Sequence, residues 1–524
     1  ALAEGDDEAA RMLDESLDHM ARGGLFDQLG GGFHRYATDQ EWKIPHFEKM
    51  LYDNAHLLAL YTRAHARTGN PEAERIVRAT AAFLAREMTG EHGELWSAID
   101  AETAGREGAF YVWTLGELTA VLGAEDAGFL APIYGFSGAP FFEDDHFVLH
   151  LPDGLATQAE RRHMTYDDLL AQIEPLRARL FETRAERPRP LTDDKVLTDW
   201  NGMAIHGLAL AARHFDDADM LDQARRAASF VLEHLDSGEG PLRHSWRAGE
   251  TRVDALLGDY VFFVQGLLTL HEADPEGDWL AAAMRLTDEQ IERLADAKGG
   301  FFTSAQRDDV LVRSKEVLDG ALPAANAIAA LNLIELARLD GDARWRQHAE
   351  TTLKAFAIFA SRALDGAKML TLAVHRFHAV FPGVETSDLD APMTEAEETA
   401  RDVVQARFGV GEIEEGDWIP FRLEVTLSPG WHVYAHQPGA PVPATRLEGQ
   451  DATLRDVVYP GGDEKVLADS STSVMVYSGT FEVVGRVRPT SEQAKLRLHY
   501  QACDDRRCLP VSGLEVELGR AMSS

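Results

Sequence analysis

The sequence predicts two kinds of domain in one chain, an all-helical domain built from antiparallel hairpins and a smaller antiparallel β-sandwich after it. The chain has 524 residues, of which 45% are hydrophobic, so more than one core is expected. Leu, Ala and Arg dominate the first 380 residues, whereas Val, Thr, Gly and Pro prevail after residue 400. Apolar residues recur three and four positions apart before this change and alternate after it, which indicates helices and then strands.

The helical part, residues 1–380, is expected to consist of hairpins. Apolar periodicity predicts helices near residues 6–22, 46–68, 71–89, 164–182, 198–214, 217–236, 254–272, 277–296, 320–339 and 342–362. Short connections, for example at residues 68–71, 215–217 and 339–342, make neighbouring helices antiparallel. A glycine followed by a large apolar residue recurs at Gly24, Gly93, Gly240 and Gly300, at intervals of about 60 to 75 residues or twice that. This repeat is typical of a closed toroid of hairpins, and an open solenoid is the alternative.

The rest of the chain divides into a linker and a sheet domain. Residues 381–400 are acidic and have no sustained apolar face, so we expect a linker there. In residues 401–524, alternating runs near 403–410, 419–427, 474–487 and 496–500 are separated by Pro-Gly turns. This pattern predicts an antiparallel sandwich.

Charge and hydropathy exclude two classes of partner. The formal net charge is −36, which argues against binding to nucleic acid or to an anionic membrane surface. The sequence contains no run of eighteen apolar residues, so no direct membrane span is expected. The first residues lack the pattern of a signal peptide, but the chain starts without Met and is expected to be a piece of a longer precursor.

The densest polar cluster begins at Pro45, a favourable first helical position. Similar clusters stand where later helices are expected to begin. In a hairpin toroid the inner helices run parallel, so these starts would meet at one rim around a cavity. Carboxylates and aromatic rings together suit a saccharide, because sugar rings stack on aromatic faces while hydroxyl groups need paired donors and acceptors. The predicted catalytic residues are His46, Glu48, Tyr52, Asp53, Asp199 and Asp259, and the predicted substrate-binding residues are His34, Arg35, Asn54, Lys195, Trp200, Asn201 and Tyr260.

Each of these residues also has a structural interpretation. Asp199 suits a helix cap, and His46 with Asp53 suits a hydrogen-bonded pair that positions neighbouring helices. For a single residue the structural interpretation is favoured; for the recurrence of such clusters at several helix starts, a pocket is favoured. No metal-binding spacing and no phosphate-binding loop occur, so neither a metal nor a cofactor is predicted.

The two cysteines, Cys503 and Cys508, are separated by four residues, all of which are charged. A turn of this length can return the second thiol to disulfide distance. A closed loop this short adds little stability, so a redox-active pair is favoured over a structural staple or two unpaired thiols.

Two segments closely resemble a known family. Gly23 to Tyr36, followed by Trp42 and Pro45 to Asn54, is similar to the YyaL or spermatogenesis-associated thioredoxin-like family, and Asp194 to Gly202 matches another of its motifs. The resemblance covers residues 6 to 375 and implies an (α/α)6 six-hairpin glycosidase-like barrel. Members of that family usually begin with a thioredoxin-like domain, which this chain lacks, so the barrel is expected to be truncated at its start.

The carboxy-terminal part, residues 401–520, resembles the amino-terminal domain of the thiol:disulfide interchange protein DsbD. Pro429 to Ala435 and Tyr500 to Pro510 carry the likeness. The resemblance implies an immunoglobulin-like sandwich in which Cys503 and Cys508 stand at the redox cysteines.

Three functions remain open from the sequence. The first is a redox-linked protein with a thioredoxin-like partner or domain, the second a saccharide hydrolase or 2-epimerase, and the third a non-catalytic scaffold. If the cysteine domain is redox-active outside the cytoplasm, a periplasmic or exported location is expected, and otherwise a cytoplasmic one.

Overall fold

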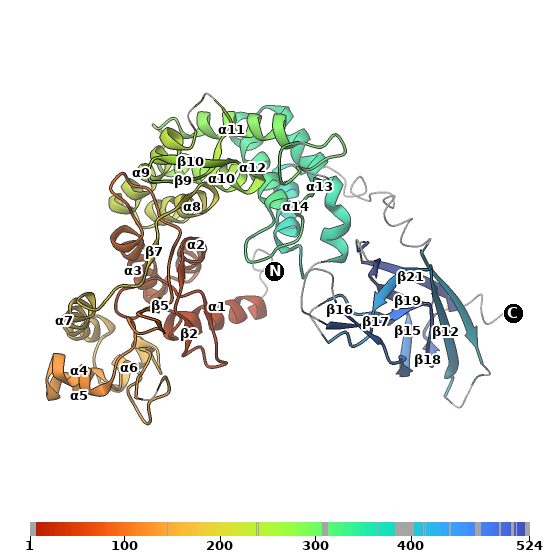
Figure 1. Cartoon of the computed structure of the whole chain (residues 1–524), viewed down its shortest axis with the longest axis horizontal. Coiled ribbons are helices and arrows are strands. Elements are labelled where there is room, and N and C mark those ends of the chain that lie inside the picture. Colours follow the sequence, from red (N-terminus) through yellow and green to blue (C-terminus); the bar gives the residue numbers. More distant parts are fainter. Residues whose placement is uncertain are drawn as a thin grey trace. The chain divides into compact units, whose positions relative to one another are not determined.

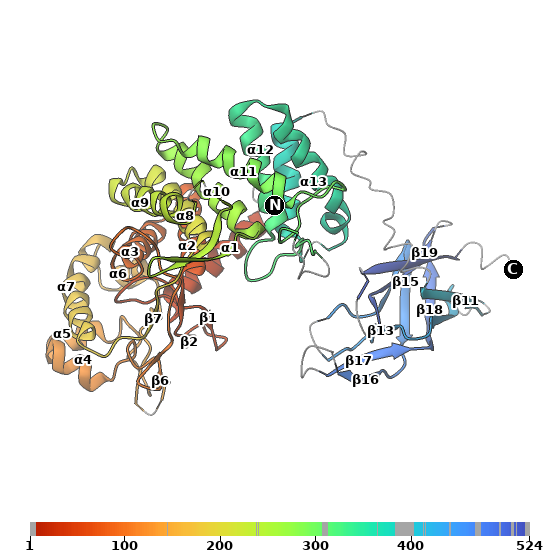
Figure 2. The same ribbon diagram turned by 45° about the horizontal axis from the view of Figure 1, so that its top comes forward.

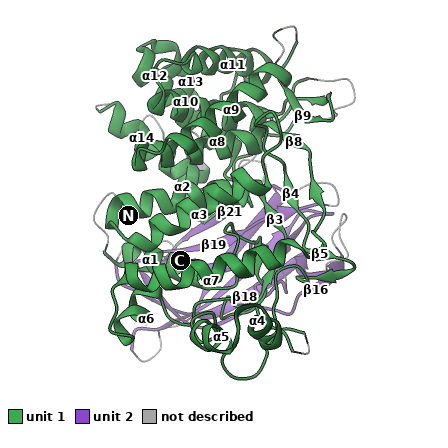
Figure 3. Ribbon diagram, turned by 90° about the vertical axis from the view of Figure 1, so that its left-hand side faces the viewer, with its two compact units in different colours: residues 1–390 green, residues 391–524 purple. Residues whose placement is uncertain are grey.

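The computed structural model describes residues 7–382 and 403–518, apart from gaps at 144, 237, 239, 307–312, 364, 412, 414–415, 440–441, 467–472, 492–493, 505–507 and 510. Two compact units, residues 1–390 and 391–524, are coloured separately in Figure 3. Most of the expected linker, at residues 383–400, lies outside the described residues.

The first unit is made of helical hairpins that follow one another along an arc (Figure 1). Helices α2, α8, α10 and α12 form its inner layer with α14, and α3, α9, α11 and α13 are their outer partners. The predicted class, a helical toroid followed by an immunoglobulin-like sandwich, is confirmed. The helices of this unit are α1 (Asp7–Arg22), α2 (Leu51–Thr68), α3 (Pro71–Glu87), α4 (Leu115–Leu122), α5 (Ala124–Leu130), α6 (Leu155–Arg161), α7 (Tyr166–Ala185), α8 (Thr198–Phe215), α9 (Ala218–His234), α10 (Leu257–Ala273), α11 (Trp279–Leu294), α12 (Ala325–Asp340), α13 (Ala343–Arg362) and α14 (Lys368–Val380).

The turns of the hairpins have a common chemistry that the sequence encodes locally. Outer helices α3, α9 and α13 each start after a side chain, Asn70, Asp217 or Asp342, that accepts a hydrogen bond from a backbone N–H of the first turn. Helix α2 ends at Gly69, whose φ of 66° favours glycine. Each hairpin therefore reverses within a few residues.

A buried asparagine locks three of the inner helices to the segments that precede them. The side chain of Asn54 accepts a hydrogen bond from Phe33 N–H at 2.7 Å and donates one to Phe33 C=O at 3.0 Å. Asn201 brackets Leu95 in the same way, and Asn326 brackets Phe301. Leu95 and Phe301 follow two of the repeated glycines, so this bracket gives the glycine repeat a structural reason.

The start of α2 differs from the prediction. The helix begins at Leu51 instead of Pro45, because the preceding residues pair as short strands. Strand β2 (Pro45–His46) pairs with β1 (Tyr36–Ala37), and β3 (Lys49–Met50) pairs with β4 (Ala98–Ile99). Backbone pairing thus takes the N–H and C=O groups that a longer helix would have used.

Further short strands lie mainly in the segments that lead into the inner helices. They are β5 (Glu102–Thr103), β6 (Arg106–Glu107), β7 (Thr192–Asp193), β8 (Val196–Leu197), β9 (Arg243–Arg247) and β10 (Glu250–Asp254). Strand β4 also pairs with β7, and β9 pairs with both β8 and β10. These pairings hold the helix starts, where most of the predicted site residues stand.

The second unit is an antiparallel sandwich (Figure 2). One sheet has the order β11-β12-β18-β15, and the other strands form β16-β17-β13-β20 and β14-β19-β21. Alternate side chains of β12, such as Leu423 and Val425, enter the core. The strands are β11 (Val404–Val410), β12 (Ile419–Leu427), β13 (His432–Tyr434), β14 (Arg446–Gln450), β15 (Ala452–Val458), β16 (Asp463–Val466), β17 (Ser473–Ser478), β18 (Thr480–Pro489), β19 (Lys495–Tyr500), β20 (Ala502–Cys503) and β21 (Ser512–Glu517).

Within the described residues, none of the helices combines the length and the apolar character needed to cross a bilayer.

Candidate functional site

A polar cluster stands just before α2 and on its first turn. The guanidinium of Arg35 lies 3.0 Å from the carboxylate of Glu48, and its charge also acts on Tyr52, the second residue of α2. The ring of His46 stacks on Tyr36, and its Nδ1 lies 2.6 Å from the carboxylate of Glu107, which comes from β6. The strands before α2 therefore bring His46 and Glu48 close to the predicted residues on its first turn.

Asp53 is the carboxyl group of this cluster whose environment is least satisfied. Its Oδ2 is buried and makes no hydrogen bond within the described residues. Burial raises the pKa of Asp53 to about 7; Arg35 opposes this shift and the negative charge of Glu48 adds to it. Asp53 can therefore exchange a proton near neutral pH, as a general acid or base must.

A second acidic group stands at the starts of α8 and α10. Asp259 is 1% exposed, and its carboxylate accepts hydrogen bonds from His244 Nδ1 at 2.9 Å and from Leu256 N–H at 2.8 Å. The backbone N–H of Asp199 donates to the same carboxylate at 3.3 Å. Burial and the adjacent charge of Asp259 raise the pKa of Asp199 to about 7.

The imidazole of His244 is hydrogen-bonded to Asp259, one of these two acids. Its hydrogen bond with Asp259 raises the pKa of His244, because the carboxylate stabilises the protonated ring. Ligand atoms of Asp199, His244 and Asp259 lie within 4.8 Å of one another, a spacing that could also hold a metal ion. The oxygens of Asp259 are already hydrogen-bonded, so we interpret the group as an acid-base cluster.

Two aromatic side chains connect the acidic groups. The ring of Tyr52, next to Asp53, meets the ring of Trp200, next to Asp199, edge to face at a centroid distance of 4.8 Å. Trp200 is partly buried and packs against the main core. The starts of α2 and α8 thus form one rim, named here the rim cluster: Arg35, His46, Glu48, Tyr52, Asp53, Asp199, Trp200, His244 and Asp259.

Three predicted substrate-binding residues make hydrogen bonds within the fold. His34 is buried; its Nδ1 hydrogen-bonds Phe47 C=O at 2.8 Å, and burial together with the charge of Lys49 lowers the pKa of the imidazole to about 3. Asn54 and Asn201 are fully buried, and their side-chain amides are hydrogen-bonded to backbone groups in the brackets described above. Their polar groups are engaged within the fold, and the substrate-binding role stays a prediction.

Tyr260 and Lys195, the other two predicted substrate-binding residues outside the rim cluster, also have partners within the protein. Tyr260 is fully buried, and its hydroxyl donates to the carboxylate of Glu289 at 2.6 Å, which removes it from the rim cluster. Lys195 is exposed and pairs with Asp193 at 3.1 Å. Its charge lowers the pKa of His244, so Lys195 acts on the rim cluster through electrostatics.

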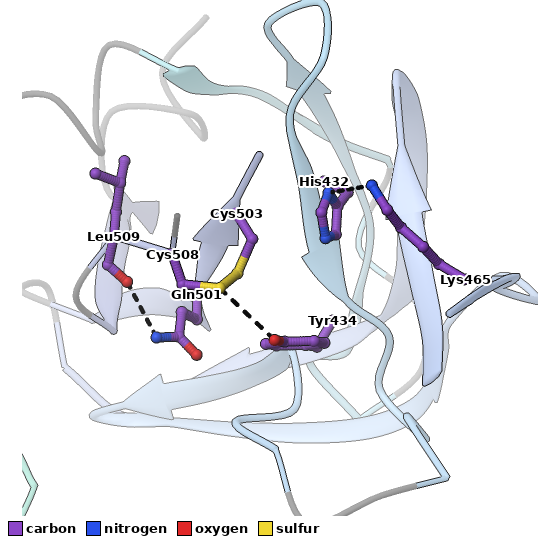
Figure 4. Close-up of a disulfide and its surroundings, with 7 residues drawn as sticks. All are labelled: His432, Tyr434, Lys465, Gln501, Cys503, Cys508 and Leu509. Atoms are coloured by element: carbon purple, nitrogen blue, oxygen red, sulfur yellow. Dashed lines mark hydrogen bonds between the residues drawn. A yellow bond between two sulfur atoms is a disulfide. The ribbon is translucent and has the colours of Figure 1, made fainter. Parts of the chain in front are cut away.

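The second candidate site is the disulfide between Cys503 and Cys508, drawn in Figure 4. Cys503 is 2% exposed and packs with Tyr434, Val474 and Val476, whereas Cys508 is exposed. The hydroxyl of Tyr434 lies 3.7 Å from Cys508 Sγ. The two sulfur atoms therefore have unequal surroundings, one in the core and one at the surface.

The strand next to Cys503 carries a second polar pair. His432 faces Cys503 directly in the β13–β20 ladder, so their side chains lie on the same face of the sheet. Nδ1 of His432 is 3.2 Å from the ammonium nitrogen of Lys465, on β16 (Figure 4). Residues 505–507, which include the two arginines between the cysteines, lie outside the described residues.

Comparisons with known proteins agree with this division. The helical unit is similar to spermatogenesis-associated protein 20 of Rattus norvegicus, with 31% identity over 388 residues, 67% of this chain and 49% of the relative. The Mus musculus protein of the same name is 32% identical over 392 residues, 68% of this chain and 50% of the relative. The chain spans about half the length of the curated relatives it matches.

Residues 403–519 match the family model described as thiol:disulfide interchange protein DsbD, N-terminal. Among solved structures, cellobiose 2-epimerase from Bacillus thermoamylovorans is 10% identical, with a TM-score of 0.42 over 71% of this chain and 86% of that one. The reduced DsbD amino-terminal domain of Neisseria meningitidis is 17% identical, with a TM-score of 0.18 over 26% of this chain and 92% of that one. Both resemblances predicted from the sequence are confirmed.

Sequence reasoning missed several residues of the two candidate sites. His244 and Glu107 come from short strands far along the chain from their partners. His432 lies in the Pro429 to Ala435 segment that carried the DsbD resemblance, and that segment was the available signal. No sequence signal pointed to Lys465, since only the β16–β17–β13 strand order places it beside His432.

Proposed function

We propose that the second unit exchanges its Cys503–Cys508 disulfide with a dithiol protein, a thioredoxin-like partner or domain. The observation that carries this proposal is the unequal burial of the two sulfur-bearing residues, because a partner thiolate can approach only an accessible sulfur. The match of residues 403–519 to a thiol:disulfide interchange family supports it.

The exchange starts at the exposed cysteine. A partner thiolate attacks Cys508 Sγ and forms a mixed disulfide, and Cys503 Sγ leaves as a thiolate. The partner's second thiolate then attacks the partner sulfur of that bond and releases Cys508 as a thiolate. Two electrons pass to the cysteine pair, the partner becomes a disulfide, and the two cysteines take up two protons. The reverse steps pass the electrons to another disulfide.

His432 is a positioning residue for the leaving thiolate. The ammonium of Lys465 donates to His432 Nδ1, so the neutral ring carries its proton on Nε2. A cation and an N–H donor beside Cys503 stabilise a negative sulfur. We expect His432→Phe to raise the pKa of the Cys503 thiol in the reduced protein, a change that a purely structural role of His432 would not produce.

A trapping experiment tests the order of attack. Cys503→Ser leaves Cys508 as the single thiol, and Cys508→Ser is the matched control. With a thioredoxin variant that keeps one, chemically activated cysteine, Cys503→Ser should form the mixed disulfide at least about tenfold faster, since access controls the rate. Equal rates, or a native pair that resists strong reductant, would refute the proposal.

A second candidate function, action on a saccharide, rests on the rim cluster. Its support is the pair of carboxyl groups, Asp53 and Asp199, whose pKa values are both raised to about 7, beside the Tyr52 and Trp200 rings. The test is turnover or binding of a panel of neutral disaccharides, with Asp53→Asn and Asp199→Asn as variants. Binding that survives both variants would remove the rim cluster from this role.

A further inference from the structure

The concave wall of the helical unit carries a cavity that is distinct from the rim cluster. Its volume is about 760 Å³, and it is lined by residues of α2, α8, α10, α12 and α14. Volumes of about 300 to 1,000 Å³ are typical of small-molecule sites. Neither Asp53 nor Asp199 is among the lining residues.

Arg63 is the central polar group of this wall. It lies ten residues after Asp53 on α2, which corresponds to about 15 Å along the helix axis. Its guanidinium donates a hydrogen bond to His206 Nε2 at 3.3 Å. His206 Nδ1 in turn donates to the hydroxyl of Thr269 at 2.7 Å, and that hydroxyl donates to Gln265 C=O at 3.0 Å.

This chain of hydrogen bonds fixes Arg63 without neutralising it. Burial and the positive charge of Arg63 lower the pKa of His206 to about 3, so the imidazole is neutral at pH 7; its Nε2 accepts from Arg63 and its Nδ1–H donates to Thr269. Burial also lowers the pKa of Arg63. An arginine side chain nevertheless stays protonated in proteins, so the guanidinium keeps its charge and most of its N–H donors for another group.

The other arginines of the wall are already paired. Arg213 forms an ion pair with Glu272, and Arg376 lies 2.5 Å from Glu335. For Arg63, none of the carboxylates in the described part of the chain lies within ion-pair distance. The cavity thus has one excess positive charge at a defined place.

Apolar and amide side chains complete the wall around that charge. Leu60 and Leu210 flank the arginine on α2 and α8, and Leu331 faces the cavity from α12. The amides of Gln265 and Asn332 also line it and suit hydroxyl groups. An oxyanion would pair with the guanidinium in a bidentate, charge-assisted contact.

We propose that this cavity binds a small hydroxylated molecule that carries an oxyanion, a carboxylate or a phosphate, and that Arg63 contacts the oxyanion. The proposal is independent of the cysteine chemistry and of the rim cluster. The net charge of −36 disfavours non-specific binding of anions elsewhere on the surface, so a saturable signal reports this site.

Ligand-observed NMR and calorimetry on the whole chain test the proposal with three probes: glucuronate, glucose 6-phosphate and glucose. We expect at least one anionic probe to bind with a dissociation constant below about 1 mM, and glucose to bind at least about tenfold more weakly. The two anionic probes distinguish a carboxylate site from a phosphate site. Added salt should weaken the binding.

Substitutions locate the binding. Arg63→Gln should reduce affinity at least about tenfold, and Arg63→Lys should lose less, because it keeps the charge but not the bidentate geometry. Arg67→Gln is the matched control, since it makes the same charge change one turn along α2 on a residue that pairs with Asp14 and does not line the cavity. Asp53→Asn controls for the rim cluster and should leave the affinity unchanged.

Three results would overturn the proposal. The first is the absence of binding of both anionic probes at concentrations up to about 10 mM, far above the expected dissociation constant. The second is equal binding by Arg63→Gln and Arg67→Gln, provided that both variants melt within a few degrees of the parent chain. The third is loss of binding in Asp53→Asn, which would assign the ligand to the rim cluster instead.

Discussion

Two groups of carboxylates in the helical unit differ in what their oxygen atoms contact. Asp27 is buried between two cations, with Arg184 at 2.8 and 2.9 Å and Lys49 at 2.9 Å. Burial alone would raise the pKa of Asp27, but the charges of Arg184 and Lys49 hold it well below its usual value. Asp53, in contrast, has an oxygen with no partner among the described residues, and its pKa is raised to about 7.

The comparison separates polar groups that stabilise the fold, such as Asp27, from polar groups that the fold leaves free to react, such as Asp53. Both kinds stand in the same sequence motif, since Lys49 and Asp53 are four residues apart. Composition does not distinguish them, whereas the number of satisfied hydrogen bonds does.

The sharpest test removes the charge of the buried carboxylate. Asp27→Asn should cost about 3 to 5 kcal/mol of unfolding free energy, because Lys49 and Arg184 are left as buried, unpaired cations. Urea unfolding monitored by helical circular dichroism measures the loss. Asp14→Asn, which breaks the exposed pair with Arg67, is the control and should cost less than about 1 kcal/mol. Similar losses in both variants would contradict the distinction.

The asparagine bracket should have the next largest effect. Asn201→Ala leaves Leu95 N–H and two buried carbonyl groups without their partner, so we expect a loss of about 2 to 4 kcal/mol. Asn70→Ala removes only an exposed helix cap and should lose about 1 kcal/mol. If Asn201→Ala keeps its stability but loses binding of a ligand at the rim cluster, that result would support the predicted substrate-binding role of Asn201.

The Cys503–Cys508 disulfide is expected to be reactive and to contribute little to the stability of the sandwich. Its loop of four intervening residues is short, so reduction should cost the sandwich about 2 kcal/mol or less. In a glutathione buffer the pair should titrate at a potential above about −300 mV, the upper limit for inert structural disulfides. Unfolding of the sandwich on reduction, seen by β-sheet circular dichroism, would show instead that the pair is a structural disulfide.

Asp53 should show the smallest effect, with a characteristic sign. The pKa of its carboxyl is raised on folding, so its contribution to stability is present below about pH 4 and is lost as pH rises through about 7. Asp53→Asn should change stability by no more than about 1 kcal/mol at pH 5 and become relatively more stable than the parent chain at pH 8. Thermal melts at the two pH values measure this difference, and a larger loss at pH 8 than at pH 5 would contradict it.

Local sequence patterns were sufficient for the fold class and for most elements. Helical periodicity located α7 to α13 to within a few residues, because each buries one stripe against its neighbours. Alternation located β11, β12 and β19 in the same way. Periodicity did not reveal α4 to α6, which are 7 or 8 residues long, or that Pro45 to Met50 pair as strands.

The sequence by itself also determined which kinds of residue gather where inner helices begin, and that two cysteines stand close along the chain. Only the tertiary structure decided which of those residues are ready for chemistry. Asn54, Asn201 and Tyr260 share the helix starts with Asp53 and Asp199, yet their polar groups are bonded to the fold. The reason is physical: hydrogen-bond satisfaction, burial and the field of neighbouring charges depend on segments such as β9 and α11, which supply His244 and Glu289 and become neighbours of these residues only on folding.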